Sequence, residues 1–271
     1  MVAGPPTTQA TADQRGLMEP TSTAEPPIIV STPPDPRDLA PAWHTVLFIV
    51  IFCALSFGGT KRTEAATGHA HWPIYLETMA MQWLLMLYIA WGLWMRKRRF
   101  RDLIGGRWNS TEAVLMDIGI AVGFFFANML VRAAIAGVLL AVNHNLKANS
   151  LDNAKHVAQL IGPRSPWELL LFIGVALTAG FCEEVMFRGY LQQQFALWTR
   201  STSLGVVISA VFFCFGHAYQ GWFLAIQVGL LGLMLGILAA WRKSLRPGMI
   251  AHATQDIISG ILVRLLLSGA K

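Results

Sequence analysis

Two adjacent carboxylates and an arginine interrupt a stretch that is otherwise typical of a membrane-spanning helix. Glu183 and Glu184 are followed by Arg188, whereas the preceding run, 167–179, carries one charged residue, Glu168. An ionised side chain at the centre of a bilayer costs roughly 2.5–3.5 kcal/mol on insertion scales. These three groups therefore need partners or a water-filled cavity, and they are the first candidates for chemistry.

Helical geometry predicts different surroundings for the two carboxylates. Glu184 and Arg188 are four residues apart, so they share a helix face and can pair. Glu183 lies about 100° around the helix from Glu184 and can point elsewhere. A buried ion pair that fixes helix packing would explain Glu184 and Arg188, but it would not explain a second acid beside them.

Two later apolar runs carry further titratable side chains at helical spacing. His217 follows Phe213 by one helical turn, and His252 and Asp256 share a helix face. A single intramembrane histidine is more often a helix–helix contact than a catalytic group. Two histidines, an aspartate and the acidic pair on three helices can satisfy one another only by converging. We therefore expect them to meet around one cavity.

Such a convergent set supports two hydrolytic mechanisms. In the first, a carboxylate takes a proton from water, the water attacks a carbonyl, and the imidazoles stabilise the oxyanion. In the second, His217, His252 and Glu183 bind a zinc ion with an open position, and the other glutamate is the base. Both mechanisms hydrolyse an amide or an ester. The first needs no cofactor, and the residues alone leave the choice open.

The composition indicates a polytopic membrane protein with an all-α transmembrane bundle. The chain has 271 residues, of which 54% are hydrophobic and 13% charged, against about 25% charged in soluble domains. The basic residues stand in short clusters between apolar runs, which indicates membrane orientation and not nucleic-acid binding. The three cysteines lie inside apolar runs, so no disulfide framework is predicted.

The chain divides into an N-terminal arm and a membrane domain. Residues 1–41 hold nine of the thirteen prolines, so this arm is predicted to be disordered. Residues 42–271 form the predicted membrane domain. It contains about seven apolar runs near the length that crosses a bilayer, at 42–59, 74–95, 113–142, 167–195, 203–218, 221–241 and 247–268.

Loop charges predict the orientation of these spans. The cluster Arg96–Arg101 is the strongest signal, and Arg200 and the group at 242–246 fall on the same side if there are seven spans. We assign that side to the cytoplasm, which places the N-terminus inside and the C-terminus outside. The loops at 60–73 and 143–166 carry a weaker positive charge on the outer side.

Two glycine patterns predict close helix contacts. Gly119 and Gly123 are four residues apart, and so are Gly232 and Gly236. Small residues at this spacing let helices approach closely. The contacts lie either within the bundle or between two copies of the chain, and the first is the simpler expectation.

Two further pairs of polar residues stand outside these motifs. His69 and His71 lie in a predicted outer loop, where we expect solvated side chains. Asn128 and Arg132 are one helical turn apart in the third apolar run. This second pair either lines the cavity or pairs with a neighbouring helix.

Taken in order, the three polar groups resemble the motifs of a known family. The family is that of the CAAX-processing and bacteriocin-processing (CPBP, or Abi) intramembrane proteases, which includes the type II CAAX prenyl endopeptidase. The resemblance covers roughly residues 165–262. The residues that carry it are Glu183-Glu184-x-x-x-Arg188, Phe213-x-x-x-His217 and His252-x-x-x-Asp256.

This resemblance implies an all-helical core whose motifs face a shared cavity, and proteolysis of membrane-associated proteins or peptides. By analogy Glu183 activates water, assisted by His217. His252 and position 256 would face the oxyanion. The analogy leaves supporting roles to Glu184 and Arg188.

Position 256 departs from the usual pattern, because the family often has asparagine there. Asparagine can donate a hydrogen bond to an oxyanion, whereas an ionised aspartate cannot. Asp256 must then be protonated, orient His252 or help hold a metal. The departure keeps the zinc mechanism open.

The expected partners are the lipid bilayer and a membrane-associated protein or peptide substrate, with no nucleic acid. Two other functions compete with an endopeptidase. One is a non-catalytic scaffold or immunity protein of the same fold. The other is an ion or proton pathway, since buried acids and histidines also mark transporters. The acids and histidines are expected to form one cluster, and not a series of sites through several spans. This arrangement disfavours an ion or proton pathway.

Overall fold

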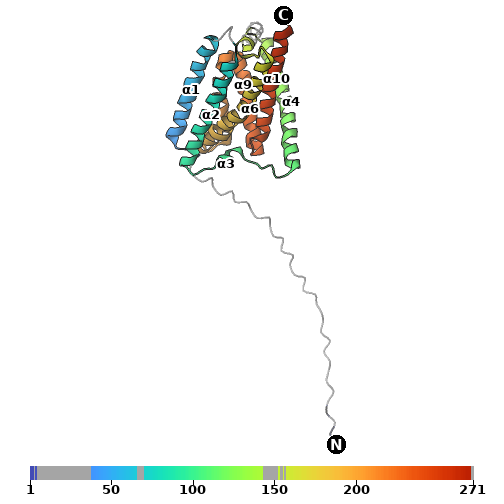
Figure 1. Ribbon diagram of the computed structural model, residues 1–271. Helices are drawn as coiled ribbons and strands as arrows, with labels where there is room; N and C mark the ends of the chain where they lie inside the picture. Colours follow the sequence, from blue (N-terminus) through green and yellow to red (C-terminus); the bar gives the residue numbers. More distant parts are fainter. Residues whose placement is uncertain are drawn as a thin grey trace. The chain divides into compact units, whose positions relative to one another are not determined.

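The membrane domain is built from helices. The computed structural model describes residues 1, 2, 4, 38–65, 70–142, 152, 155 and 157–269, and its named elements all lie within Pro36–Lys271 (Figure 1). Within these residues the structure has no strand beyond one isolated bridge, which confirms the all-α prediction. The elements are α1 (Ala42–Ala65), α2 (Trp72–Met95), α3 (Phe100–Ile104), α4 (Thr111–Val142), α6 (Pro166–Glu183), η1 (Glu184–Leu191), α7 (Gln192–Thr199), α8 (Thr202–Gly216), η2 (Ala218–Gln220), α9 (Trp222–Arg242) and α10 (Arg246–Gly269).

Each of the seven predicted apolar runs coincides with a helix. The fourth is the longest, because α6, η1 and α7 form one continuous stretch, Pro166–Thr199. By length and composition this stretch, α2, α4 and α9 can each cross a membrane, while α8 and the apolar part of α1 are shorter. These helices are consistent with seven spans, and they make the chain an integral membrane protein.

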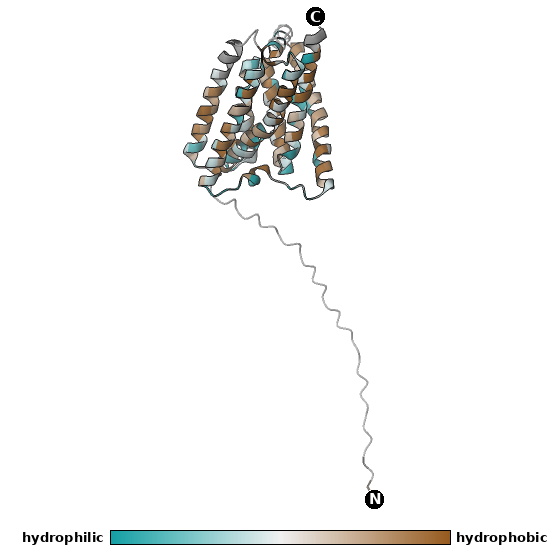
Figure 2. Ribbon diagram, in the orientation of Figure 1, coloured by the Kyte–Doolittle hydropathy of each residue, from teal (hydrophilic) through white to brown (hydrophobic). Residues whose placement is uncertain are grey.

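The outward faces of the helices are apolar. Large hydrophobic side chains such as Trp83 and Leu87 in α2, and Leu130 and Val138 in α4, are at least half exposed. Figure 2 shows hydrophobic residues along most of the helix lengths. Lipid tails are as apolar as these side chains, so the surface suits a bilayer.

The most completely buried element is η1, a π-helical turn in the middle of the long fourth helix. All eight of its residues are buried. It contacts α2, α3, α8 and α9, and Phe48 of α1 packs in the same hydrophobic cluster. The Gln192 N–H bonds to the Phe187 carbonyl, five residues back. Such π turns are rare in proteins and frequently occur at functional sites.

Helices α6 and α10 approach closely where small residues meet. A Cβ added at Gly180 would lie 2.7 Å from the Ala253 Cβ, and one at Gly248 would lie 3.2 Å from Glu184 Oε2. This contact brings the beginning of α10 to the level of η1. His252, only two turns into α10, therefore reaches the acidic pair in the middle of the fourth helix.

The two glycine patterns have different outcomes. Gly232 and Gly236 are buried in α9, where added Cβ atoms would meet Phe213 and Gln192, so this pattern serves packing within the bundle. Gly119 and Gly123 are exposed on α4, and an added Cβ would meet nothing within 4 Å. The expectation that the α4 glycines pack within the bundle is therefore wrong.

The connection between α2 and α4 docks on the connection between α9 and α10. The Leu245 N–H donates to the Ile104 carbonyl at 2.8 Å, and Gly105 forms a bridge with Ser244. The short helix α3 in this connection was not expected from the sequence. The contact places the two strongest basic clusters on the same side of the bundle, as the charge pattern predicts.

The packed chain begins before the predicted boundary of the arm. Leu39 and Ala40 are buried, and their N–H groups donate to Gln194 Oε1 at 2.9 and 3.3 Å. The predicted disorder is therefore wrong for these two residues. Residues 5–37, most of the predicted arm, lie outside the described part of the chain.

Candidate active site

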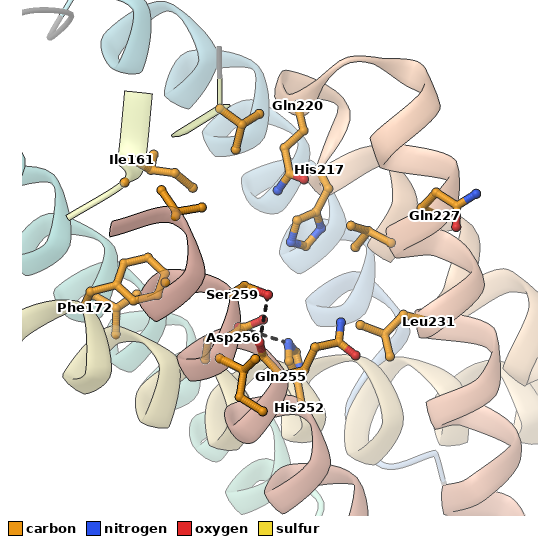
Figure 3. Close-up of a pocket in the computed structure, with 18 of the residues that line it drawn as sticks. Ile161, Phe172, His217, Gln220, Gln227, Leu231, His252, Gln255, Asp256 and Ser259 are labelled. Carbon is orange, nitrogen blue, oxygen red and sulfur yellow. Dashed lines mark hydrogen bonds and ion pairs between the residues drawn. The ribbon is translucent and has the colours of Figure 1, made fainter. Parts of the chain in front are cut away.

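A cavity of about 650 Å³ lies among α2, α4, α6, α8, α9 and α10. Glu183, His217, His252 and Asp256 all line it, and Figure 3 shows His217 and Asp256 pointing into it from different helices. A second cavity, of about 500 Å³, lies on the side of α1 and α2 and shares Glu183 and His217 with the first. The expected convergence of these side chains is therefore present.

Beneath the cavity wall lies a buried ion pair. Arg188 Nη1 donates to Glu184 Oε1 at 2.8 Å, and both side chains are 1% exposed. The guanidinium also lies over the Phe213 ring at 4.3 Å. The pairing expected from the four-residue spacing is therefore confirmed, and Glu184 faces away from the cavity.

His252 connects this ion pair to the cavity. Its Nδ1 lies 2.9 Å from Glu184 Oε1, and the paired carboxylate accepts, so Nδ1 donates its hydrogen. Its Nε2 lies 3.8 Å from Glu183 Oε2 and 3.6 Å from Asp256 Oδ2. The carboxylates of Glu183 and Asp256 thus approach the same imidazole nitrogen, and like charges gathered around one site repel one another. Sharing one or more protons among His252 Nε2 and the two cavity-lining acids relieves that repulsion.

Glu183 lines the cavity, and only one of its two carboxylate oxygens has a hydrogen bond within the described chain. Its Oε1 accepts from Gln82 Nε2 of α2 at 2.8 Å, whereas its buried Oε2 has no hydrogen-bond partner in the described chain. The side chain is 15% exposed. One oxygen thus holds the carboxylate in place, and the other lies 3.8 Å from His252 Nε2 without a hydrogen bond.

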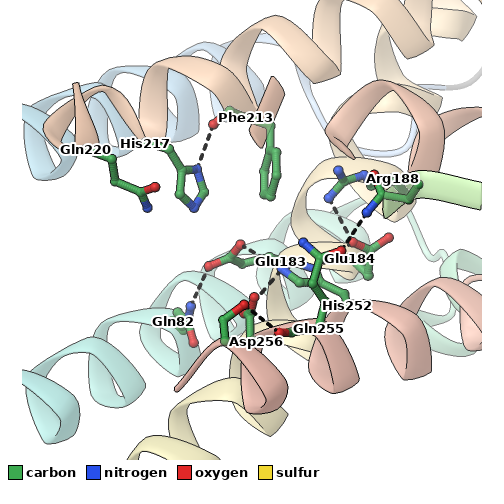
Figure 4. Close-up of polar contacts among 12 residues, drawn as sticks. Gln82, Glu183, Glu184, Arg188, Phe213, His217, Gln220, His252, Gln255 and Asp256 are labelled. Atoms are coloured by element: carbon green, nitrogen blue, oxygen red, sulfur yellow. Dashed lines mark hydrogen bonds and ion pairs between the residues drawn. The ribbon is translucent and has the colours of Figure 1, made fainter. Parts of the chain in front are cut away.

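The end of α8 positions His217. The helix ends at Gly216, and His217 projects toward Glu183 (Figure 4). Its Nδ1 lies 2.9 Å from the Phe213 carbonyl. A carbonyl only accepts, so Nδ1 carries the hydrogen, and in the neutral ring Nε2 is an acceptor. The backbone carbonyl of Phe213 thus orients His217, and the Phe213 ring covers the Arg188 guanidinium.

The donor set for zinc does not come together in the described chain. No three His, Cys, Asp or Glu side chains of those residues lie close enough to hold a metal ion. His217, His252 and Glu183, the expected ligands, share the cavity wall without forming such a group. The zinc site therefore stays a prediction.

Several polar residues of the site were not anticipated. Gln82 and Gln227 each interrupt an apolar run, and both line the cavity. Gln255 accepts a hydrogen bond from Asn128 Nδ2 at 2.6 Å, linking α10 to α4. The sequence signal for these residues was a neutral polar side chain within an apolar run. That signal is weaker than a charged side chain in the same place, because a charge costs more to bury in a membrane.

His71 does not have the solvated side chain expected of a loop histidine. It is fully buried, its N–H donates to Glu168 Oε1 at 2.7 Å, and its Nδ1 lies 2.9 Å from the Gly162 carbonyl. Gly162 lines the large cavity, so this contact fixes part of the cavity wall. His69 lies outside the described residues.

The fold and the cavity define a helical membrane protein in which acids and imidazoles from separate parts of the chain line one cavity. Residues 165–258 match the family described as type II CAAX prenyl endopeptidase, Rce1-like. The match includes all three motifs and confirms the resemblance over this segment.

A segment of the chain also resembles a curated bacterial protein. It is 32% identical over 92 residues to the uncharacterized protein YpbD of Bacillus subtilis (strain 168), covering 34% of this chain and 45% of that protein. The match thus spans less than half the length of this relative. No solved structure matches the chain significantly.

Proposed function

We propose that this protein is an intramembrane endopeptidase that hydrolyses a peptide bond of a membrane-associated protein or peptide. The observation that carries the proposal is Glu183, which lines a cavity beside His217 and whose Oε2 has no hydrogen-bond partner in the described chain. Buried acceptors without a partner are uncommon in proteins. The match of residues 165–258 to an endopeptidase family supports the same function.

The first step needs a water molecule held by two acceptors. Glu183 and His217 both line the cavity, and Glu183 Oε2 and the His217 Nε2 lone pair can each accept one of its hydrogens. Glu183 removes one proton as the water oxygen forms a bond to the carbonyl carbon of the substrate. The carbonyl π electrons move to oxygen and give a tetrahedral oxyanion.

The second step needs a donor for the oxyanion and a proton for the leaving amine. His252, which lies between two cavity acids, stabilises the oxyanion when its Nε2 is protonated. Glu183 returns its proton to the amide nitrogen as the C–N bond breaks. The products are a carboxylic acid and an amine, and Glu183 is again a carboxylate.

The surrounding groups hold these parts in place. Gln82 fixes the other oxygen of Glu183, and the Glu184–Arg188 pair holds Nδ1 of His252. Asp256 lies on the far side of the same imidazole and orients it or shares its proton. Arrangements in which the supporting side chains are themselves fixed lower the reorganisation needed during reaction.

The test is cleavage of membrane-peptide substrates by purified, lipid-reconstituted protein. We expect Glu183→Gln to lower kcat by about 10²–10⁴, the range typical of a lost general base, with unchanged thermal unfolding. Glu112→Gln, at an exposed acid in the first turn of α4, is the matched control. Full activity in the Glu183 variant would contradict the proposal and favour a non-catalytic protein. A chelator challenge with metal analysis of the same sample tests the zinc alternative.

A further inference from the structure

The end of the bundle at which α3 lies is strongly basic (Figure 1). The α2–α4 connection bridges to the α9–α10 connection there at Gly105 and Ser244, and α7 bonds to α3 through Gln193. Ten lysines and arginines and one acid lie in three short segments of this end, 96–107, 200 and 242–246. Stretches far apart in the chain thus place their positive charges at one end of the molecule.

Six of these cations have exposed side chains that no hydrogen bond or ion pair joins to another described residue. By contrast, Arg242 pairs with Asp117 at 3.1 Å, and Arg246 donates to the Gly105 carbonyl. We call the six exposed cations the basic rim: Arg96, Lys97, Arg99, Arg107, Arg200 and Lys243. None of them lines either cavity, so the rim is separate from the candidate active site.

Three rim residues end helices in the left-handed backbone region. The φ angles of Lys97, Arg200 and Lys243, at the ends of α2, α7 and α9, are 54°, 55° and 51°. Glycine is the usual residue at such a helix end, because a Cβ atom strains this conformation. Membrane orientation requires positive charge in a loop, but it does not require that charge at a strained position. A cation is therefore held at each of three places where glycine would be more relaxed.

Exposed tryptophans indicate the depth of the rim in the membrane. Trp94, Trp198 and Trp241 each stand two or three residues before one of these three cations, and each is at least 37% exposed. At the opposite end of the bundle, Trp72 and Trp222 have no lysine or arginine within three residues. Tryptophan rings of membrane proteins gather at the level of the lipid headgroups. The rim cations, just beyond these rings, therefore lie at the level of the lipid phosphates.

We propose that the basic rim binds the phosphate groups of anionic phospholipids in the adjoining leaflet. A headgroup such as that of phosphatidylglycerol fits, because it offers phosphate oxygens without an ammonium group that the rim would repel. The rim lies outside both cavities, so it suits several headgroups side by side and not one soluble anion enclosed in a pocket. This inference is independent of the proposed endopeptidase function.

Lipid competition measures the binding. The full chain in a neutral detergent is loaded with fluorescent phosphatidylglycerol, which is then displaced by unlabelled phosphatidylglycerol, phosphatidylcholine or inorganic phosphate. We expect phosphatidylglycerol to compete about tenfold or more strongly than phosphatidylcholine, since each lysine or arginine near an anionic surface contributes about fivefold in affinity. The preference should fall as salt is added, because exposed charges are screened.

Two triple variants separate charge from backbone strain. Lys97→Gly, Arg200→Gly and Lys243→Gly together remove three charges and relax three left-handed positions. We expect this variant to lose about fivefold in lipid preference for each cation removed, to unfold at the same or a higher temperature in the neutral detergent, and to cleave peptides as the wild type does. The matching glutamine variant keeps the strained backbone and should lose the preference equally.

Lys155→Gln with Arg264→Gln is the control, because both residues lie toward the other end of the bundle. This variant should keep the whole preference. Equal competition by the two lipids, or a preference that survives in the triple variants, overturns the rim site. Inorganic phosphate that displaces the probe as well as phosphatidylglycerol does would assign the rim to soluble anions and overturn the lipid assignment.

The unfolding temperature identifies the remaining alternative. Cations at the end of a helix also interact favourably with the helix dipole. Loss of the preference only together with a lower unfolding temperature in neutral detergent would assign the cations to the helix ends and overturn the proposal. Selective lipid binding by a protein that cleaves no peptide would support the rim site while removing the enzyme, so the two hypotheses fail separately.

Discussion

At the scale of single residues, the adjacent acids Glu183 and Glu184 have opposite surroundings. Glu184 is fully buried between Arg188 and His252, so its charge is matched within the protein. Glu183 is held by the neutral donor of Gln82 and lines the cavity, and its other oxygen has no hydrogen-bond partner in the described chain. One side chain is therefore structural and the other is available for chemistry.

Removing Arg188 tests the structural half of this division. Arg188→Leu leaves Glu184 buried without its cation, and breaking such a pair costs about 3–5 kcal/mol. We expect a large loss of unfolding free energy, measured by denaturation of the reconstituted protein. Arg101→Leu is the control, because Arg101 Nε lies 3.9 Å from Asp102 Oδ1 and the two side chains are 67% and 64% exposed, and such pairs contribute about 0–1 kcal/mol. Equal losses in both variants would contradict the assignment.

At the scale of elements, the site depends on how closely α6 and α10 pack. Gly180 allows the backbone of α10 to approach at Ala253 and Met249. That approach sets the distance from His252 to Glu184, and from His252 to Glu183. The cavity acids and the histidine therefore work together only while this contact holds.

A single methyl group tests the contact. Gly180→Ala places a Cβ 2.7 Å from that of Ala253 and 2.9 Å from the Met249 carbonyl oxygen, and such overpacking typically costs about 1–3 kcal/mol. We expect lower stability and reduced peptide cleavage, measured on the same preparation. Gly119→Ala adds the same methyl group to an exposed helix position with open space around it and should be neutral or stabilising. Retained stability in Gly180→Ala would show that the two helices can separate without harm.

At the scale of the whole molecule, the basic connections mark one end of the bundle. The connection between α2 and α4 meets that between α9 and α10 at Gly105 and Ser244. Exposed cations such as Arg96, Lys97 and Lys243 lie in these connections. Positive loops are retained in the cytoplasm, so the arrangement supports the expected orientation.

Reporter fusions test this orientation in cells. A reporter active only in the cytoplasm should be active when inserted after Lys97 and inactive when fused after Lys271. A reporter active only outside should give the reverse pattern. Activity of one reporter at both positions would mean an even number of membrane crossings between them, against the predicted five.

The sequence by itself determined the helices and the identity of the polar groups. Lipid exposure requires long apolar runs with internally bonded backbones, so the helices that coincide with the seven apolar runs could be placed from hydropathy. Charges within such runs need partners, so convergence of Glu183, His217, His252 and Asp256 could be inferred. The pairing of Glu184 with Arg188 followed from helical spacing alone.

The tertiary structure decided which side chains face one another and which of them line the cavity. The π-helical turn, the α6–α10 contact and the end of α8 at Gly216 set the depths at which the motifs meet, and none of these is encoded in local periodicity. Neutral residues such as Gln82 and Gln227 became part of the site only through packing between distant helices. The burial of His71 likewise comes from contacts about ninety residues away in the chain, because a side chain's surroundings depend on long-range contacts that no short stretch of sequence contains.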